Sequence, residues 1–518
     1  MKKYFGNYDK TISEVSAVFC LIFVAVTMVK PIGVQKVFNS IFRFFISNFG
    51  WYYLLCGIIF LIVCFTLAFS KYGEMRLGKD DEKPEFSLFS WFSMLFSAGM
   101  GIGLVFWGVA EPIYHFAGPP FAEPGTAAAA VEAMRYSFFH WGLHPWASYG
   151  VVALCLAYFQ FRKDMPGLIS STLLPVLGEK GMKGPTGKAV DTFTIIVSLF
   201  GIATSLGLGA MTITTGLNFV YDIPNTVTTS IVVIAVITVM FIISAVTGVE
   251  KGIKWLSNIN MSLALMLMAF LFLSGPTRFI INIMIESIGS YAQNILWMSF
   301  FLDTQGVVAE HTGYDWVGTW TIFYWAWWIT WVPFVGSFLA RISRGRTIRE
   351  FVLGVLVAPT LLSCIWFAIL GGSAMHIEMF GTGGITEAAH TELTSAIFTM
   401  FTHFPMTGLL SVLTMIIVAI FFVTSADSST YVISMMTSSG NLNPSSGLRV
   451  FWGIISGGIG VALVLAGGLS AVQAVSFALT FPFAFLMLIM IYCLYQSLRE
   501  EKAINDETIV SAQDTGQI

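Results

Sequence analysis

Charged residues are scarce in this sequence: only 11% of its 518 residues are Asp, Glu, Lys or Arg. A typical soluble domain contains about 25% of these residues. The shortage excludes an ordinary soluble enzyme and a disordered chain. The formal net charge is −3. The chain therefore lacks the basic excess of a nucleic-acid-binding protein, and we expect no nucleic-acid partner.

Cysteine is rare as well. There are six cysteines, and each lies inside or at the edge of an apolar stretch. Such cysteines usually act as small buried hydrophobic residues, so we infer neither disulfides nor a metal cluster. A cleavable signal peptide is not expected either, because the first apolar run is long and lacks a clear small-residue cleavage site.

Apolar residues are abundant, at 56% of the chain, and they occur in long continuous runs. A membrane-spanning helix needs about 20 mostly apolar residues. The runs therefore predict an all-α integral membrane protein with twelve transmembrane helices. We place these helices near residues 13–35, 50–70, 88–110, 136–161, 189–215, 226–248, 252–274, 318–342, 348–371, 407–437, 448–468 and 471–496.

Positive charge is distributed unevenly among the loops. If the N-terminus is cytoplasmic, all but five of the 26 Lys and Arg residues fall on the cytoplasmic side. Positive residues collect in the cytoplasmic loops of membrane proteins. The distribution predicts an even number of spans with both termini in the cytoplasm. The exceptions are Lys30, Lys36, Arg43, Arg135 and Arg278.

The third expected span contains Gly99, Gly101 and Gly103, which we call the glycine run (residues 99–103). Glycine is a poor helix former, and unwound backbone occurs in a membrane only where it lines a cavity or is buried in protein. Discontinuous helices at mid-membrane indicate a transporter's substrate and ion site. The alternative is close helix packing through small residues. Three glycines within five residues favour the transporter interpretation.

The tenth span contains the polar run Thr424-Ser-Ala-Asp-Ser-Ser-Thr430. Polar groups inside a span are costly unless they are paired, and hydroxyl oxygens are the donors that a hard cation such as sodium requires. We interpret Thr424 and Ser425, with the glycine run as their partner, as an ion site. For Asp427 alone, an interhelical hydrogen bond is the favoured interpretation.

Tryptophan gathers in residues 316–331, which contain six of the chain's 15. Trp327, Trp328 and Trp331 share one helix face with Tyr324. Tryptophan often forms a belt at the membrane interface. That belt explains Trp316 and Trp320. It does not explain Trp331, which lies about 16 Å deeper along a helix.

A second aromatic cluster lies in the fourth span, in the sequence His140-Trp-Gly-Leu-His-Pro-Trp-Ala-Ser-Tyr149. We expect Pro145 to kink the helix and so to gather Trp141, Trp146 and Tyr149 on one cavity. Aromatic faces around a cavity suit a quaternary ammonium, since a desolvated cation over a ring gains about 0.5–2 kcal/mol or more. A sugar would need many hydrogen-bonding groups instead.

Other polar residues have simpler explanations. His140 and His144 are spaced i, i+4, but no third metal ligand lies nearby in sequence. We expect buried, hydrogen-bonded histidines first, a proton relay second and a metal site last. The acidic residues Glu378, Glu387 and Glu392 are expected to be solvated loop charges.

These motifs resemble the betaine/carnitine/choline transporter family over nearly the whole chain. The tryptophan-rich segment that leads into a basic loop is the most specific of them. The motifs are Ala98-Gly-Met-Gly-Ile-Gly103, Ala110-Glu-Pro112, His140-Trp-Gly-Leu-His-Pro-Trp146, Phe323-Tyr-Trp-Ala-Trp-Trp328, Phe338-Leu-Ala-Arg-Ile-Ser-Arg-Gly-Arg-Thr347 and Thr424-Ser-Ala-Asp-Ser-Ser429.

The resemblance implies a leucine-transporter-like fold with two inverted five-helix repeats, a homotrimer, and a bacterial inner (cytoplasmic) membrane location. The corresponding division of the chain is a cytoplasmic N-terminus (1–12), two peripheral helices (13–87), the first repeat (88–275), an outer amphipathic helix and loop (276–317), the second repeat (318–496) and a short cytoplasmic tail (497–518).

The resemblance also implies the site residues. One side of a substrate box would be Trp141, Trp146 and Tyr149, and the other Trp327, Trp328 and Trp331. Met100 and the backbone around Gly101 would approach the substrate carboxylate, as a helix dipole favours. A first sodium would be held by Ser97, Met100, Phe421, Thr424 and Ser425, and a second by Thr204 and Phe334.

The expected function is sodium-coupled import of glycine betaine or a close trimethylammonium or dimethylsulfonium solute for osmoprotection, with sodium as coupling ion and no organic cofactor. The polar run and Trp331-Val-Pro-Phe334 favour sodium coupling over carnitine exchange, and Gly103 favours betaine over choline. The alternatives are a choline or carnitine carrier, proton-coupled or sodium-independent. A membrane enzyme and a pure osmosensor are more distant ones.

Overall fold

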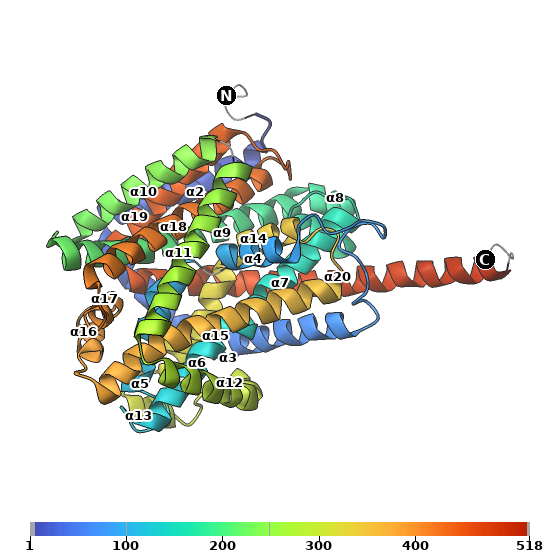
Figure 1. Ribbon diagram of the computed structural model, residues 1–518. Helices are drawn as coiled ribbons and strands as arrows, with labels where there is room; N and C mark the ends of the chain where they lie inside the picture. Colours follow the sequence, from blue (N-terminus) through green and yellow to red (C-terminus); the bar gives the residue numbers. More distant parts are fainter. Residues whose placement is uncertain (1–5, 100, 248, 515–518) are drawn as a thin grey trace.

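The computed structural model describes residues 6–99, 101–247 and 249–514, and these residues form a bundle of long helices (Figure 1). Within this part of the chain no strand is present beyond one isolated antiparallel bridge between Arg76 and Thr347. The predicted all-α fold class is therefore confirmed.

Ten helices in the described ranges are long and apolar enough to cross a membrane. They include the segment from η3 (Gly318–Ile322) through α14 (Phe323–Ile342). The others are α2 (Lys10–Val29), α3 (Pro31–Phe69), α9 (Pro185–Tyr221), α10 (Val227–Thr247), α11 (Val249–Ser274), α15 (Ile348–Phe380), α18 (Thr407–Thr437), α19 (Ser446–Leu465) and α20 (Leu469–Asp514).

Two further expected spans are each divided into shorter helices. The third consists of α4 (Leu88–Gly99) and α5 (Ile102–Ala117), and the fourth of α6 (Ala127–Trp141) and α7 (Leu143–Ala157). The longest of these pieces has 16 residues, which is too short to count as a spanning helix by itself. The total of twelve spans remains a prediction.

The segment between the first two expected spans is helical, so the helix predicted to begin near residue 50 begins at Pro31 instead. α3 is 39 residues long and starts with Pro31 in its first turn, where the missing N–H is not needed. Lys36 and Arg43 lie on its exposed face. On the other face, the rings of Phe42 and Phe45 pack on Phe477 and Phe481 of α20, with centroids 5.3 Å apart in both pairs. The charged residues interrupt the apolar run, so sequence analysis did not include this amphipathic stretch in the second helix.

The break in the fourth span lies at Gly142, and the predicted kink at Pro145 is wrong. Gly142 has φ −99° and ψ −126°, and a Cβ there would lie 2.4 Å from the carbonyl oxygen of Phe138. Pro145 sits in the first turn of α7, where its missing N–H costs nothing. His140 and His144 are therefore on different helices and do not share the face that their spacing suggested.

The segment predicted to form an outer amphipathic helix contains α12 (Thr277–Phe300) and then α13 (Val307–Thr312). α12 packs against α6 and α15 through buried residues such as Ile280 and Ile283. Figure 1 shows α13 and the short helices α16 (Ile385–Thr391) and α17 (Ser395–Phe401) at the end of the molecule remote from the C-terminal end of α20.

The packing of the helices repeats in the two halves of the chain. α5 packs on α15, and α7 packs on α14. If the third to seventh spans are mapped onto the eighth to twelfth, α5 corresponds to α14 and α7 corresponds to α15. The α5–α15 contact then becomes the α14–α7 contact, and the reverse. The contact of α9 with α19 likewise maps onto that of α18 with α10, and the α9–α18 and α10–α19 contacts map onto themselves. A repeat of five helices in each half of the chain produces this pattern, and its inverted sense remains a prediction.

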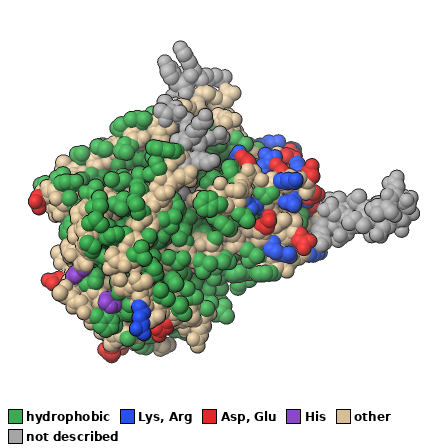
Figure 2. All heavy atoms as spheres, in the orientation of Figure 1, with side chains coloured by type: hydrophobic (Ala, Val, Ile, Leu, Met, Phe, Trp, Pro, Cys, Tyr) green, Lys and Arg blue, Asp and Glu red, His purple; other side chains and the backbone are tan. Residues whose placement is uncertain are grey.

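Several of the segments predicted to be cytoplasmic meet at one end of the molecule. Figure 2 shows charged side chains gathered at that end and apolar side chains over most of the remaining face. Lys79 pairs with Asp164 at 2.6 Å, and Arg341 pairs with Glu85 at 2.6 Å. Arg162 also pairs with Glu501 of α20. Basic residues from distant parts of the chain thus share one surface.

Candidate substrate and ion site

The third span is broken at the glycine run. α4 ends at Gly99, α5 begins at Ile102, and Gly101 between them has φ −109° and ψ −112°. The predicted interruption is therefore confirmed. Met100 and the side chain of Ser97, both predicted sodium ligands, lie outside the described residues.

Each glycine of the run touches a predicted site residue. A Cβ on Gly99 would lie 2.5 Å from the ring of Trp146, and one on Gly103 would lie 2.8 Å from the ring of Trp141. A Cβ on Gly101 would lie 3.2 Å from the hydroxyl oxygen of Ser425 and 3.7 Å from the ring of Phe421. Small residues are needed for this close approach. The broken segment thus lies between the aromatic residues and the polar run.

The predicted aromatic residues of α6, α7 and α14 come together in the core. We call Trp141, Trp146, Tyr149, Trp327, Trp328 and Trp331 the aromatic box. Ring centroids are 4.8 Å apart between Trp141 and Trp328, 6.1 Å between Tyr149 and Trp328, and 5.6 Å between Trp146 and Tyr149. Trp327 stacks on Trp328 at 5.1 Å. All six side chains are buried.

Two tryptophans assigned to an interfacial belt are buried instead, which corrects that expectation. Trp316 is 1% exposed and packs on Tyr136 at 4.6 Å. Trp320 is 6% exposed and packs on His115 at 4.5 Å. Helix spacing alone places these residues near the membrane surface, but α5 and α6 cover them. Trp331 is buried as expected and contacts Trp327 at 6.4 Å.

The aromatic box contains polar hydrogens without partners among the described residues. They are the N–H groups of Trp146 and Trp331 and the hydroxyl of Tyr149. Leaving such a group buried and unpaired costs about 1–3 kcal/mol. A carboxylate can accept from all three. The box therefore offers ring faces to a cation and hydrogen-bond donors to an anion, which together suit a zwitterion.

Two hydroxyls of the polar run differ in their bonding. The Thr424 hydroxyl donates to the carbonyl oxygens of Ile420 and Phe421, at 3.0 Å each. The Ser425 hydroxyl is buried, has no partner in the described chain and lies beside Gly101. An oxygen with free lone pairs can serve as a cation ligand. The structure therefore brings Phe421 and Ser425 to the glycine run, with Thr424 next to Ser425 on the same helix.

Asn260 of α11 is a polar neighbour of this region that sequence analysis missed. With its amide oriented to satisfy both ends, it donates to the carbonyl of Ile417 at 3.2 Å and accepts from the N–H of Phe421 at 3.3 Å. Its side chain thus bridges two backbone groups one turn before Thr424. The available signal was an amide side chain within an expected span, where a polar group is costly unless it is paired.

The residues predicted for a second sodium lie along the contact of α9 with α14. The Trp327 N–H donates to the Thr204 hydroxyl at 3.4 Å, and that hydroxyl donates to the carbonyl of Gly201 at 2.7 Å. Phe334 packs on Trp331 at 5.3 Å. Thr204 is thus joined to the aromatic box through Trp327, and its pairing with Phe334 remains a prediction.

Asp427 forms an interhelical hydrogen bond, as favoured from its sequence position. Its Oδ2 accepts from the Ser244 hydroxyl of α10 at 2.7 Å. The side chain is buried. The contact joins α18 to α10 just after the proposed ion ligands Thr424 and Ser425 in the chain.

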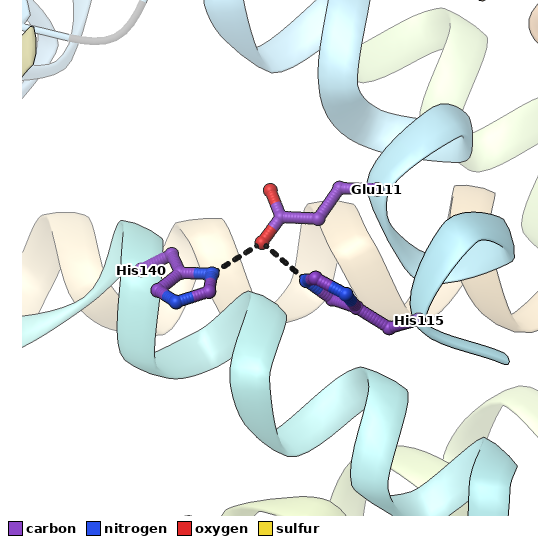
Figure 3. A group of neighbouring side chains, drawn as sticks. All are labelled: Glu111, His115 and His140. Atoms are coloured by element: carbon purple, nitrogen blue, oxygen red, sulfur yellow. Dashed lines mark hydrogen bonds and ion pairs between the residues drawn. The ribbon is translucent and has the colours of Figure 1, made fainter. Parts of the chain in front are cut away.

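The largest polar feature that sequence analysis missed is centred on Glu111 of α5 (Figure 3). Its Oε1 accepts from Nδ1 of His140 at 2.7 Å and lies 3.3 Å from Nε2 of His115. Its Oε2 accepts from the Trp141 N–H at 2.6 Å and from the Tyr324 hydroxyl at 2.5 Å. Glu111 and His115 are spaced i, i+4, which was the available signal.

Glu111, His115 and His140 are close enough together to be considered as metal ligands. However, each carboxylate oxygen already faces two partners, and Nε2 of His140 bonds to the Thr321 hydroxyl at 2.9 Å. These hydrogen bonds use about all the lone pairs that a carboxylate offers. The cluster is therefore explained as a hydrogen-bond network without a metal.

Both histidines of the fourth span are buried and hydrogen-bonded, which confirms the interpretation placed first for them. His144 stacks on Trp325 with centroids 5.0 Å apart, and its Nε2 lies 2.9 Å from the Ser299 hydroxyl of α12.

The three acidic residues expected to be solvated behave differently from one another. Glu387 is exposed. Glu378 instead accepts from the backbone N–H of Thr386 at 2.9 Å, and Glu392 accepts from the Thr215 hydroxyl at 2.7 Å. The expectation is therefore wrong for Glu378 and Glu392, which hold the outer α16–α17 segment in place.

Comparison with known proteins identifies the family. Residues 11–503 match the profile of the betaine/carnitine/choline family transporters. The chain belongs to the betaine/carnitine/choline transporter family. It is thus a multi-pass membrane transporter and not an enzyme, as predicted.

Several relatives match the chain over nearly their full length. It is 49% identical to the glycine betaine transporter OpuD of Bacillus subtilis, covering 95% of this chain and 96% of that protein. It is 45% identical to a probable glycine betaine transporter of Desulfitobacterium hafniense, with 95% and 98% covered. It is 42% identical to an ectoine/hydroxyectoine transporter of Virgibacillus pantothenticus, with 95% and 96% covered.

Among solved structures, the chain is similar to a substrate-bound, outward-open state of a Na+-coupled sialic acid symporter. The sequence identity is 14%, the TM-score is 0.44, and 86% of each chain is covered. A similarity of this size supports no conclusion about the site.

Proposed function

We propose that this transporter imports glycine betaine, or a closely related trimethylammonium or dimethylsulfonium solute, by sodium-coupled alternating access in a bacterial cytoplasmic membrane. The observation that carries the proposal is the position of the glycine run. One broken helix contacts the aromatic box through Gly99 and Gly103 and the polar run through Gly101. A solute site and an ion site would therefore share one structural element. The glycine betaine transporters among its relatives support the same solute.

The aromatic box would hold the solute by both of its charges. The trimethylammonium would lie against the faces of Trp327, Trp328 and Trp331, where cation–π attraction replaces hydrogen bonds that this group cannot make. The carboxylate would accept from the unpaired donors of Trp146 and Tyr149. The N-terminus of α5, just after Gly101, adds the positive end of a helix dipole.

Sodium would bind between the glycine run and α18. Its ligands would be the Thr424 and Ser425 hydroxyls, the backbone around Phe421, and the backbone or side chains of Ser97 and Met100. Coupling requires that the ion bind one conformational state better than the other. Because the solute has no net charge, each sodium makes transport electrogenic and contributes about 2.3 kcal/mol per 100 mV of membrane potential.

Ectoine is a second candidate solute, because an ectoine/hydroxyectoine transporter is 42% identical to this chain. Choline and carnitine remain alternatives from the family resemblance. The proposed topology places both termini in the cytoplasm, and the proposed assembly is a homotrimer. The mass of the purified complex in detergent tests the assembly.

The test is uptake of labelled glycine betaine into proteoliposomes, with sodium outside and with potassium in its place. We expect accumulation only with inward sodium, and competition by unlabelled glycine betaine stronger than by ectoine, choline or carnitine. Stronger competition by ectoine would reassign the solute. Uptake driven equally well by a proton gradient in potassium would overturn the sodium coupling.

A further inference from the structure

Glu111 is buried beside the aromatic box, and nothing in the transport scheme above uses it. We propose that Glu111 is a positioning residue that fixes the Trp141 wall of the box and sets its spacing from the Trp327–Trp328 wall. The inference rests on the proposed function, since it assumes that the box binds the solute. Glu111 itself touches no part of the proposed solute position.

Trp141 needs such an anchor because of its place in the chain. It is the last residue of α6, directly before the break at Gly142, so the backbone beyond it does not continue the helix. Its ring edge faces Gly103 on one side and Trp328 on the other. The indole N–H is the one polar group of its side chain, and that N–H donates to Glu111 at 2.6 Å.

Glu111 connects both walls of the box. Besides Trp141 it accepts from the Tyr324 hydroxyl, and Tyr324 lies one helical turn before Trp328 on α14. Its other oxygen contacts His140, whose backbone carbonyl accepts from the Trp328 N–H at 2.9 Å. One carboxylate thus contacts the Trp141 ring directly and reaches the Trp328 ring by two routes, through Tyr324 and through His140, and these two rings meet at 4.8 Å.

A carboxylate is expensive at this depth unless fully paired, and Glu111 is completely buried. Its four contacts come from α5, α6 and α14. Both oxygens of the carboxylate are satisfied by these contacts, although Nδ1 of His115 has no partner among the described residues. A satisfied carboxylate of this kind favours one arrangement of its partners. The spacing of the rings therefore depends on a group that lies behind them.

The consequence is a specific effect on solute recognition. Without Glu111 the Trp141 ring can rotate, and the box no longer fits three methyl groups closely. We expect Glu111→Ala to raise the KM for glycine betaine about tenfold or more, the size of one lost charge-assisted hydrogen bond. The preference for glycine betaine over dimethylglycine, which has one methyl group fewer, should fall with it. The maximal rate per folded transporter should change less than the KM.

The experiment is a double-mutant cycle on KM in proteoliposomes, using Glu111→Ala, Trp141→Phe and both together. If Glu111 acts mainly through Trp141, the Glu111→Ala effect should be clearly smaller in the Trp141→Phe background, with the remainder passing through Tyr324 and His140. Glu111→Gln should stay near the wild type, since its amide oxygen can still accept from the indole N–H. An equal effect of Glu111→Ala in both backgrounds would overturn the proposal.

A matched control is Asp191→Asn on α9. Asp191 is also a buried carboxylate, and it accepts from the hydroxyl of Ser170 at 2.6 Å and from its backbone N–H at 3.0 Å, away from the aromatic box. We expect its KM and solute preference to be unchanged. If Glu111→Ala does not fold, the same cycle is run with Glu111→Gln and Trp141→Phe. Glu111→Gln is then expected to have little effect in either background, and a tenfold rise in its KM would contradict the anchor.

The two proposals fail in different ways. No uptake of glycine betaine by the wild type would reject the proposed function. Normal uptake by the wild type, with an unchanged KM and unchanged solute preference in folded Glu111→Ala, would reject only the role of Glu111.

Discussion

Gly103 and Trp141 are packed so closely that a methyl group on Gly103 would lie 2.8 Å from a ring carbon of Trp141. The same methyl group would lie 3.0 Å from the ring of Trp327. The start of α5 and both walls of the aromatic box are therefore in direct contact. If α5 moved while these rings stayed in place, the contact of Gly103 with Trp141 and Trp327 would have to break.

Gly103→Ala should disrupt solute binding. The added methyl group forces the Trp141 and Trp327 rings apart, and overpacking of this kind costs about 1–3 kcal/mol. We expect the KM for glycine betaine to rise about tenfold or more. Gly207→Ala on α9 is the control, since its Cβ would meet its nearest neighbour, Val464, at an ordinary 3.8 Å. Equal uptake kinetics for the two variants would show that Gly103 is not at the site.

Trp328→Leu and Trp331→Leu should each weaken solute affinity. Each loses a cation–π contact of about 0.5–2 kcal/mol, so the KM should rise between about twofold and thirtyfold. Trp255→Leu is the control, because Trp255 is a tryptophan of α11 that is 66% exposed. A folded Trp328 or Trp331 variant whose KM equals that of Trp255→Leu would remove that residue from the box.

Ser425→Ala should raise the sodium concentration needed for half-maximal uptake. The substitution removes an oxygen beside Gly101, and a hydrogen bond or ligand to a charge contributes about 1.5–3 kcal/mol. We expect a shift of about tenfold or more at saturating solute. Ser434→Ala is a close control, since its hydroxyl is equally buried on α18 and also lacks a partner among the described residues. A shift in both variants, or in neither, would argue against an ion ligand at Ser425.

Asp9, the N-cap residue of α2, gives a prediction about the stability of the folded protein. Asp9 accepts from the N–H of Ile12 at 3.1 Å, which caps α2, and pairs with Lys188 at 2.8 Å. Burial raises the pKa of Asp9, but these partners outweigh burial and hold the pKa below its usual value. Asp9→Ala should cost about 0.5–2 kcal/mol and lower the apparent melting temperature by about 1–2 °C.

The pH dependence separates the cap from the ion pair. Asp9→Asn keeps a capping oxygen but loses the charge. Because the folded pKa is lowered, the stabilisation is complete above the pKa of the unfolded chain and disappears as the pH falls through the folded pKa. The melting-temperature difference between the wild type and Asp9→Asn should thus be present at neutral pH and shrink on acidification. A difference that grows on acidification would contradict the sign of this pKa shift.

Much of the helical pattern followed from the sequence alone. The apolar run at residues 407–437 is one helix with those bounds, α18, since its length and composition leave no other choice in a membrane. The glycine run was found for a similar reason, because three closely spaced glycines destabilise a helix at mid-span. These signals are local, so they can be read from a short window of sequence.

What could not be predicted depends on contacts between distant segments. Gly142, at the break, lies against α12 and α15, where an added Cβ would be 3.1 Å from the Tyr291 hydroxyl and 3.2 Å from the Thr360 side chain. Pro145 was the stronger local signal. The burial of Trp316 depends on Tyr136 of another helix. The Glu111 network joins residues up to 213 positions apart. Spacing along one helix carries no information about such partners.

Equilibrium binding of glycine betaine to the purified wild type, measured calorimetrically in sodium and in potassium, tests the central claim most directly. If the glycine run joins the solute site to the ion site, sodium should tighten glycine betaine binding on the order of tenfold. Glycine betaine should tighten sodium binding by the same factor, as linkage requires. The same glycine betaine affinity in sodium and in potassium would contradict the account.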